Sequence, residues 1–372
     1  MCPSLWPACG FGSDVAVREQ PDHPVTWEKT ENGFTVCNSL IRAEINGKGE
    51  ITRLTDLESG MERVSAPANC LKMYKDTPRM FDAWGIDSMY DMSPVELDGE
   101  SSISLLSADP WRVMLLVERK VSNSAWRQEI VFEAESRQIT FRTHADWQEK
   151  HRILKVAFPT GVHAEDAENE IQFGYVKRPT HRSRKYDADR FEVCNHRYTA
   201  LHDEKGGAAV LNESKYGVSM MEDEIGLTLL RAAKAPDPYA DIGEHDFTYA
   251  YYVWNGAFAD SEVVQKGYEL NVPVTEAEGE AASNSLLCID QSNVIVESVK
   301  AAEDGSGDMI VRLYESMNGS RSARITVPKG VTAAWRCSLA EEKQVALPLE
   351  NGSIPLALRP FEIATIRLSA KS

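Results

Sequence analysis

One short stretch of the sequence combines residue types that bind sugars. Residues 79–91 read RMFDAWGIDSMYD, which places Trp84 between two acids, Asp82 and Asp87. Carboxylates accept hydrogen bonds from hydroxyls, and an indole offers a flat apolar face to the C–H side of a pyranose. Gly85 permits the bend that would bring Asp87 to the same side. The stretch predicts a sugar-binding loop, although a buried tryptophan that anchors the loop, with two solvated acids, fits the same letters.

A second candidate lies before the most aromatic strand of the chain. PDPYADIGEHDF contains Asp237, Asp241 and His245, and Arg231 precedes it. Two prolines and a glycine fix this loop, and loops on a rigid sheet often carry binding residues. Arg231 could pair with Asp237 or Asp241. The alternative is a loop that its own Asx turns and an internal ion pair stabilise.

A third candidate is the basic run that begins at Lys177. RPTHRSRKYD contains Arg178, His181 and Asp187. A solvated surface loop is the favoured interpretation, because charge runs usually face water.

Metal binding has one weak candidate. Cys194, His196 and His202 would share one face if a single strand contained all three. An ordinary mixture of core cysteine and surface histidine is the favoured interpretation. The chain has no phosphate-binding glycine motif, no H-E-x-x-H and no G-x-S-x-G elbow. The 57 acids allow a carboxylate pair to be imagined almost anywhere, so that signal is weak.

Charge and composition exclude several classes of protein. The 372 residues have a formal net charge of -17 and are 42% hydrophobic, so a substantial core is expected and a nucleic-acid partner is not. No run approaches the ~18 apolar residues of a membrane span, and the N-terminus does not resemble a signal peptide. The seven cysteines are scattered and odd in number, which favours reduced thiols and a cytoplasmic location.

Alternating apolar and polar residues predict an all-β protein. The tetrapeptide NGKG joins two such runs, 33–45 and 50–57, as a hairpin. Further strands are predicted over 111–121, 126–134, 138–147, 151–159, 170–179, 191–203, 207–214, 216–223, 225–232 and 246–256. In the last of these, Phe247, Tyr249 and Tyr251 alternate and are expected in the core. One helix is expected over 260–270, with Asp260 or Ser261 as its N-cap.

A change in composition divides the chain. Residues 271–285 are small, acidic and rich in turn formers, which is typical of a linker. Short strands separated by turns follow it and predict a small antiparallel sandwich. The expected domains are therefore a large β domain over 1–270, the linker over 271–285 and a small β-sandwich over 286–372.

Six stretches, in order along the chain, resemble the C-terminal region of glycoside hydrolase family 38, the α-mannosidases of cytosolic and vacuolar type. They are GFTVCNSLIRAEINGKGEITRLTDLESG, FDAWGID, EIQFGYVKRPTHRSRKYDADRFEVCNHRY, LLRAAKAPDPYADIGEHDFTYAYY, GYELNVP and LRPFEIATIRL. The resemblance covers the chain from about residue 9 onward. Two positions depart from the family pattern: Gly85 replaces the second acid of D-A-W-D-I-D, and Tyr186 replaces a tryptophan.

The resemblance implies a fold, an activity and partners. The fold would be a supersandwich like that of galactose mutarotase, followed by a small antiparallel β-sandwich. The activity would be retaining hydrolysis of α-mannosides, with zinc in the full-length enzyme. The family's zinc ligands and nucleophile belong to an N-terminal catalytic domain, so no catalytic residue and no metal ligand is assigned to this chain, and the chain alone is expected to be inactive.

The implied partners are α-mannoside glycans and the catalytic domain of the same enzyme, with neither nucleic acid nor membrane. The residues expected to bind substrate are Asp82, Trp84, Asp87, Arg231, Asp237, Asp241 and His245. Two alternative functions stay open. One is a stand-alone carbohydrate-binding β protein. The other is a mutarotase-like epimerase that pairs His181 or His245 with Glu192.

Overall fold

The computed structural model describes residues 10–11, 20–275 and 284–370. The chain divides into two compact units. Of the described residues, the larger unit contains 20–170 and 176–273, and the smaller contains 10–11, 171–175, 274–275 and 284–370. Both units are built almost entirely from antiparallel sheets, which confirms the predicted all-β class. Part of the expected linker, 276–283, lies outside the described residues.

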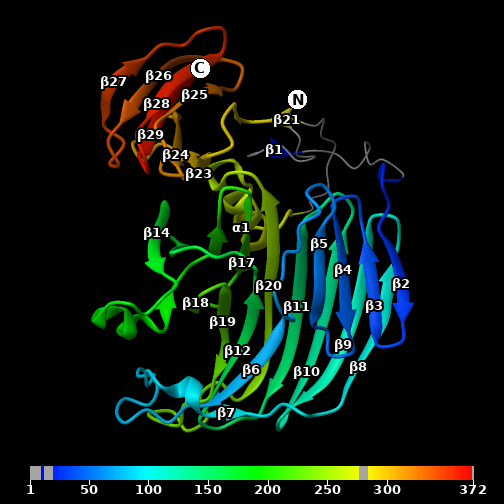
Figure 1. Cartoon of the computed structure of the whole chain (residues 1–372). Helices are drawn as coiled ribbons and strands as arrows, with labels where there is room; N and C mark the ends of the chain where they lie inside the picture. The colour runs from blue at the N-terminus through cyan, green and yellow to red at the C-terminus, as the bar shows by residue number, and fades with distance from the viewer. Residues whose placement is uncertain (1–9, 12–19, 276–283, 371–372) are drawn as a thin grey trace. The chain divides into compact units, whose positions relative to one another are not determined.

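Three sheets make up most of the larger unit (Figure 1). The four-stranded sheet contains β2 (Thr26–Thr30), β3 (Gly33–Cys37), β4 (Ile41–Asn46) and β5 (Ile51–Asp56). The six-stranded sheet has the order β15 (Val193–Cys194), β18 (Gly217–Met221), β19 (Glu224–Arg231), β12 (Arg152–Pro159), β6 (Cys70–Lys75) and β7 (Pro94–Val95). The nine-stranded sheet has the order β14 (Gly174–Pro179), β13 (Asp166–Ile171), β16 (Tyr198–His202), β17 (Gly206–Asn212), β20 (Gly243–Asn255), β11 (Gln138–Trp147), β10 (Ser124–Glu133), β9 (Arg112–Val121) and β8 (Ser101–Ala108).

One apolar core extends over all three sheets. Phe247, Tyr249 and Tyr251 of β20 are buried in it, as their alternation predicted. Phe158 of β12 stacks on Tyr251 with ring centroids 5.0 Å apart, which joins the six-stranded sheet to the nine-stranded one. The buried hydroxyl of Tyr249 donates to Asn69, 2.7 Å away, so its polar atom is satisfied.

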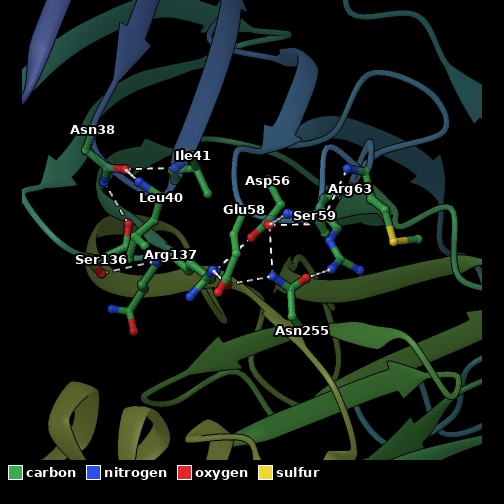
Figure 2. A network of polar contacts seen from close by, with 12 residues as sticks. Asn38, Leu40, Ile41, Asp56, Glu58, Ser59, Arg63, Ser136, Arg137 and Asn255 are labelled. Atoms are coloured by element: carbon green, nitrogen blue, oxygen red, sulfur yellow. Dashed lines mark hydrogen bonds and ion pairs between the residues drawn. The ribbon is translucent and has the colours of Figure 1, made fainter.

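A polar network ties the hairpin of the four-stranded sheet to the nine-stranded sheet. Asp56, at the end of β5, is fully buried and accepts hydrogen bonds from Arg137 at 2.7 Å and Asn255 at 2.9 Å (Figure 2). Burial alone would raise the pKa of Asp56, but these bonds and those from Ser59 outweigh it and hold the pKa well below its usual range. The carboxylate therefore stays charged and joins three segments of the chain.

The smaller unit contains a two-sheet sandwich with its own core. Its sheets have the orders β22 (Cys288–Ile289), β25 (Arg321–Thr326), β28 (Ser353–Leu358) and β23 (Val294–Ala301), β24 (Met309–Glu315), β29 (Ile363–Ala370), β26 (Val331–Cys337), β27 (Lys343–Leu347). A short ladder pairs β1 (Gly10–Phe11) with β21 (Asn284–Ser285). The small antiparallel sandwich that the sequence predicted after the linker is therefore confirmed.

The predicted helix forms, but its start was wrong. α1 covers Val263–Asn271 with Glu262 as N-cap, rather than Asp260 or Ser261. Phe258–Asp260 form a short 3₁₀ turn, η4, and the Ser261 hydroxyl donates to the Phe258 carbonyl at 2.7 Å to close it. The Ser261 hydroxyl therefore closes the 3₁₀ turn and does not cap α1.

Three predicted strands are each broken in two. Residues 33–45 divide into β3 and β4 because the Asn38 side chain accepts from the backbone N–H groups of Leu40 and Ile41, both at 2.8 Å. Residues 170–179 divide at Phe173, which has a positive φ of 62°. Residues 191–203 divide into β15 and β16, which lie in different sheets.

The break between β15 and β16 removes the geometry on which the metal candidate depended. Cys194 ends β15, whereas His202 ends β16, where its ring stacks on Phe258 and its Nε2 lies 3.0 Å from a Glu168 oxygen. Within the described ranges, no three histidine, cysteine or acidic side chains are grouped as metal ligands. Nor does any helix among these residues have the length and apolarity to cross a membrane.

Candidate sugar-binding loops

Two loops at one end of the larger unit carry five of the seven residues that the sequence suggested for sugar binding, Asp82, Trp84, Asp87, Asp237 and Asp241 (bottom of Figure 1). Arg231 is the last residue of β19, and His245 lies near the start of β20. The first, residues 76–93, connects β6 to β7 and includes a short 3₁₀ helix, η2 (Tyr90–Met92). The second, residues 232–242, connects β19 to β20. Both leave from the six-stranded sheet, so a common scaffold positions them.

A tight turn forms the tip of the first loop. The backbone N–H groups of Trp84 and Gly85 both donate to the Phe81 carbonyl, at 2.8 and 2.6 Å, and Phe81 itself has a positive φ of 58°. A Cβ on residue 85 would lie 2.8 Å from the Met80 carbonyl oxygen. The turn as folded thus fits glycine, and an acid at this position would require the turn to shift.

Arg231 holds this turn in place. Its guanidinium donates to Asp76 Oδ2, with Nε 2.7 Å and Nη2 2.6 Å away. It also donates to the carbonyls of Asp82 and Ala83 at 3.2 Å and of Gly85 at 2.8 Å. The predicted pairing of Arg231 with Asp237 or Asp241 was wrong, because Asp76 takes that place.

Asp76 is the buried partner of this ion pair. Only 2% of its surface is exposed, and within the described part of the chain its Oδ1 has no hydrogen-bond partner. Burial raises the pKa of Asp76, and Arg231 opposes the rise. Arg231 therefore compensates a charge that burial disfavours, and it shapes the loop at the same time.

The Asp82 side chain, on the first loop, links it to the second loop by hydrogen bonds. Its Oδ2 accepts the backbone N–H groups of Lys234 at 2.7 Å and Ala235 at 3.1 Å, and its Oδ1 lies 3.5 Å from His151 Nδ1. One carboxylate oxygen is thus committed to the second loop. This places Asp82 as a residue that positions both loops.

Trp84 is presented to solvent. It is 73% exposed, so the alternative of a buried anchoring tryptophan was wrong. Five other large apolar side chains are exposed on the same two loops. Together with Trp84 they form a set that we call the apolar rim: Met80, Phe81, Trp84, Met89, Met92 and Tyr239. Exposed aromatic and methionine side chains gathered on clasped loops are typical of a binding surface.

The remaining predicted residues are less closely joined. Asp87 is exposed on the first loop. Asp237 accepts from the Tyr239 backbone N–H at 2.8 Å, which is the Asx turn considered as the alternative. Asp241 has a positive φ of 62°, and its carbonyl, not its carboxylate, lies 2.7 Å from His245 Nε2. Asp241 and His245 therefore form no carboxylate–imidazole pair.

The sequence did not point to Asp76, His151 or Lys234. Asp76 directly follows β6, whose residues CLKMYK alternate with Leu71 and Met73 buried. That alternation was the available signal, and recognising it would have placed an acid at a strand end next to the first loop.

A buried ion pair joins Lys155 of β12, in the same six-stranded sheet, to Glu192. Lys155 Nζ lies 2.5 Å from Glu192 Oε2 and 3.0 Å from the Thr228 hydroxyl. Tyr90 and Thr228 also donate to Glu192. Burial lowers the pKa of Lys155, and Glu192 opposes this. Both Glu192 oxygens are engaged in the cluster, which gives no support to Glu192 as a general base.

The basic run forms an exposed segment that contains η3 (Lys185–Arg190). Arg178 donates to the Cys194 carbonyl at 2.9 Å, and Arg184 pairs with the buried Asp187 at 3.0 Å. His181 Nδ1 lies 3.9 Å from the same carboxylate. These contacts fold the segment on itself, consistent with the surface-loop interpretation.

Both units match models of known protein families. The model described as "Glycosyl hydrolases family 38 C-terminal domain" matches residues 36–239, and "Glycosyl hydrolases family 38 C-terminal beta sandwich domain" matches residues 293–366.

Curated relatives carry mannosidase names. The chain is 32% identical to human alpha-mannosidase 2C1 over 365 residues, which are 94% of this chain and 35% of that protein. It is 30% identical to alpha-mannosidase G of Dictyostelium discoideum, covering 96% of the chain and 34% of that protein. The chain thus spans about a third of the length of these relatives.

A solved structure shares the fold. The crystal structure of an alpha-mannosidase from Enterococcus faecalis V583 superposes with a TM-score of 0.75 at 19% identity, over 92% of this chain and 43% of that one.

Proposed function

Because the chain belongs to the C-terminal domain family of the family 38 glycosyl hydrolases, we propose that it forms the C-terminal β portion of a retaining α-mannosidase. In this role it completes the sugar cleft and packs on a catalytic domain that another part of the enzyme supplies. The observation that carries the proposal is the family match, over 36–239 in the larger unit and 293–366 in the smaller.

The two clasped loops support a role in binding α-mannoside glycans. Trp84 would stack on the apolar face of a sugar, and the exposed Asp87 would accept hydroxyl hydrogen bonds. Asp237 and Asp241 of the second loop, and His245 at the start of β20, would contact more distant parts of the glycan. Arg231 and Asp82 would act by holding the loops, since their polar atoms already bond within the chain.

The apolar rim supports packing on a catalytic domain. Its members are exposed in this chain, and burying apolar surface of this kind is the main favourable term in association. Part of the rim would meet protein and part would border the sugar.

The reactive groups would come from the catalytic domain. For retaining hydrolysis the reaction class needs an acid and a nucleophile about 5–5.5 Å apart, and we assign neither role to this chain. The described residues do not fit zinc, because no three potential ligands gather among them. The zinc of the full-length enzyme would therefore be held outside the described residues.

We also propose that the protein acts in mannose metabolism in the cytoplasm. Cys37, Cys70, Cys194 and Cys337 are free thiols. Unpaired cysteines of this number fit a reducing compartment better than an oxidising one.

A stand-alone carbohydrate-binding protein is the second candidate. The exposure of Trp84 beside acidic residues favours it, because such a surface could bind a glycan without a catalytic partner. Titrating the purified chain with methyl α-mannoside in a calorimeter separates the two. Saturable binding by the chain alone favours the second candidate.

A chain swap tests the leading proposal. The segment of human alpha-mannosidase 2C1 that aligns with this chain would be replaced by this chain, and hydrolysis of an aryl α-mannoside would be compared with that of the truncated human protein. We expect activity in the hybrid and none in the truncation. In the hybrid, Trp84→Ala should raise KM, whereas Trp27→Ala, a control on β2, should not. A folded hybrid that hydrolyses no more than the truncated protein contradicts the proposal.

A further inference from the structure

The larger unit contains a cavity of about 310 Å³ that none of the functions above uses. It lies between β6, β7, β9 and the β4–β5 turn. Its polar lining consists of Lys48, Glu50, Cys70, Lys72, Tyr74 and Arg119. A cavity of this size is large enough for a small metabolite.

Arg119 is the unusual member of this lining. It lies on the core side of β9 between the buried Val117 and Val121, and only 8% of its surface is exposed. Within the described ranges its Nε has no hydrogen-bond partner, and Glu50 is the carboxylate whose charge acts on the guanidinium. A buried guanidinium stays charged and is costly unless an anion or several acceptors satisfy it.

The neighbouring groups of the cavity leave its charge positive. Lys48 is exposed at the β4–β5 turn, and Lys72 pairs with Glu224 at 2.7 Å. Glu50 is the one carboxylate of the lining, and its Oε2 accepts from Asn46 at 2.7 Å. Because Lys72 is paired with Glu224, two cations, Arg119 and Lys48, face the single acid Glu50, in a protein whose net charge is -17.

The two remaining polar groups are neutral. Burial, followed by the nearby Glu50, raises the pKa of the Cys70 thiol, so the thiol adds no negative charge. Burial likewise raises the pKa of Tyr74 to about 12, so its hydroxyl keeps its proton and can donate a hydrogen bond. Neither group neutralises Arg119, and one of them adds a donor.

A second cavity that Arg119 borders does not share this chemistry. It measures about 550 Å³, lies along β8 to β11 and includes Glu100, Glu118 and Asp146 in its lining, together with Lys120 and Arg127. Its three acids offset its three cations, whereas among the described residues the smaller cavity has two unpaired cations for one acid, so the smaller cavity is the better match for the Arg119 charge.

We propose that the 310 Å³ cavity binds a small oxyanion, the phosphate or carboxylate group of a metabolite. Arg119 would be the buried anchor, Lys48 the exposed second cation, and Tyr74 a hydrogen-bond donor. A planar guanidinium with an ammonium nearby matches the oxygens of such a group. The site is independent of the proposed function, because Arg119, Lys48 and Tyr74 lie outside the two sugar-binding loops.

Titration of the whole chain followed by ¹H–¹⁵N NMR tests the site. Potassium phosphate, potassium acetate and potassium chloride would be added separately at matched ionic strength and pH. We expect saturable shifts of the Gly49 and Cys70–Tyr74 amides with phosphate or acetate and no such shifts with chloride. Saturation by phosphate alone identifies a phosphoryl ligand, and saturation by both identifies general oxyanion binding; either result supports the site.

Matched variants give the test its specificity. Arg119→Met should weaken the saturable binding at least ~10-fold, the effect of losing one charge-assisted hydrogen bond. Lys48→Ser, at an exposed turn, should weaken it several-fold without affecting the fold, and Lys29→Ser on β2 is the control. The proposal is overturned if no saturable shifts occur, if chloride reproduces them, or if they survive in Lys48→Ser and in a folded Arg119→Met.

Discussion

Removing the Arg231 guanidinium is the sharpest test of how the first sugar-binding loop is held. Arg231→Met keeps much of the apolar stem but leaves Asp76, 2% exposed, without its counter-charge. Breaking a buried ion pair from one side costs roughly 3–5 kcal/mol. The Arg231 side chain is itself 18% exposed, so water relieves part of this, and we expect a loss of roughly 2–4 kcal/mol.

The effect should depend on pH in a defined direction. Burial already raises the pKa of Asp76, and losing Arg231 removes the group that opposes this. The folded variant then holds a proton that the unfolded chain releases, so its stability falls as pH rises through the Asp76 pKa. The deficit relative to the natural protein should therefore be larger at pH 7 than at pH 4.

Urea unfolding at both pH values gives the free energies, and hydrogen exchange of the Trp84 and Gly85 amides reports the turn directly. Arg359→Met, which removes an 84% exposed arginine from its pair with Glu362, is the control and should cost little. Adding Asp76→Asn to Arg231→Met should recover part of the loss, because no buried charge is left unpaired. A variant within about 0.5 kcal/mol of the natural protein, with unchanged exchange at the turn, would refute the reasoning.

Three further predictions concern other sites. Trp84→Ala should change the free energy of unfolding by less than about 0.5 kcal/mol, because the side chain is 73% exposed, and yet weaken glycan binding several-fold in the swapped enzyme; a large loss of stability by calorimetry would show that Trp84 is structural. Lys155→Met should cost roughly 3–5 kcal/mol in urea unfolding because Glu192 is left buried and unpaired, and Lys155→Met with Glu192→Gln should recover much of it; equal losses in both would contradict the ion-pair account. Asp56, with its pKa held below the usual range, should stabilise the fold above about pH 4 and lose that contribution as pH falls; an Asp56→Asn variant with the same acid profile as the natural protein would argue against this.

Regular alternation made much of the fold predictable. β9, β10 and β11 follow the predicted runs closely, since β9 and β11 alternate over ten residues between a buried and an outer face and β10 over its first seven. Alternation failed where one side chain redirects the backbone. Asn38 is such a case, because it accepts from the two N–H groups that follow and its amide donates to carbonyls of Glu133 and Ser136.

The candidate site was predictable in its residues but not in its contacts. Trp84 and its neighbouring acids stood out by type, and the structure joins Asp82 to Arg231 and Lys234 beside the exposed Trp84. The partner of Arg231 did not stand out, because Asp76 is 155 residues away in sequence. Spacing along the chain suggested the nearer Asp237 and Asp241, whereas strand pairing decides which charges meet.

Hydrolysis of an aryl α-mannoside by the purified chain alone, with and without added zinc, tests the central claim most directly. The account predicts no turnover above a buffer blank in either condition, because the reactive groups are assigned to another part of the enzyme. Turnover that disappears when a residue of this chain is substituted would contradict the account.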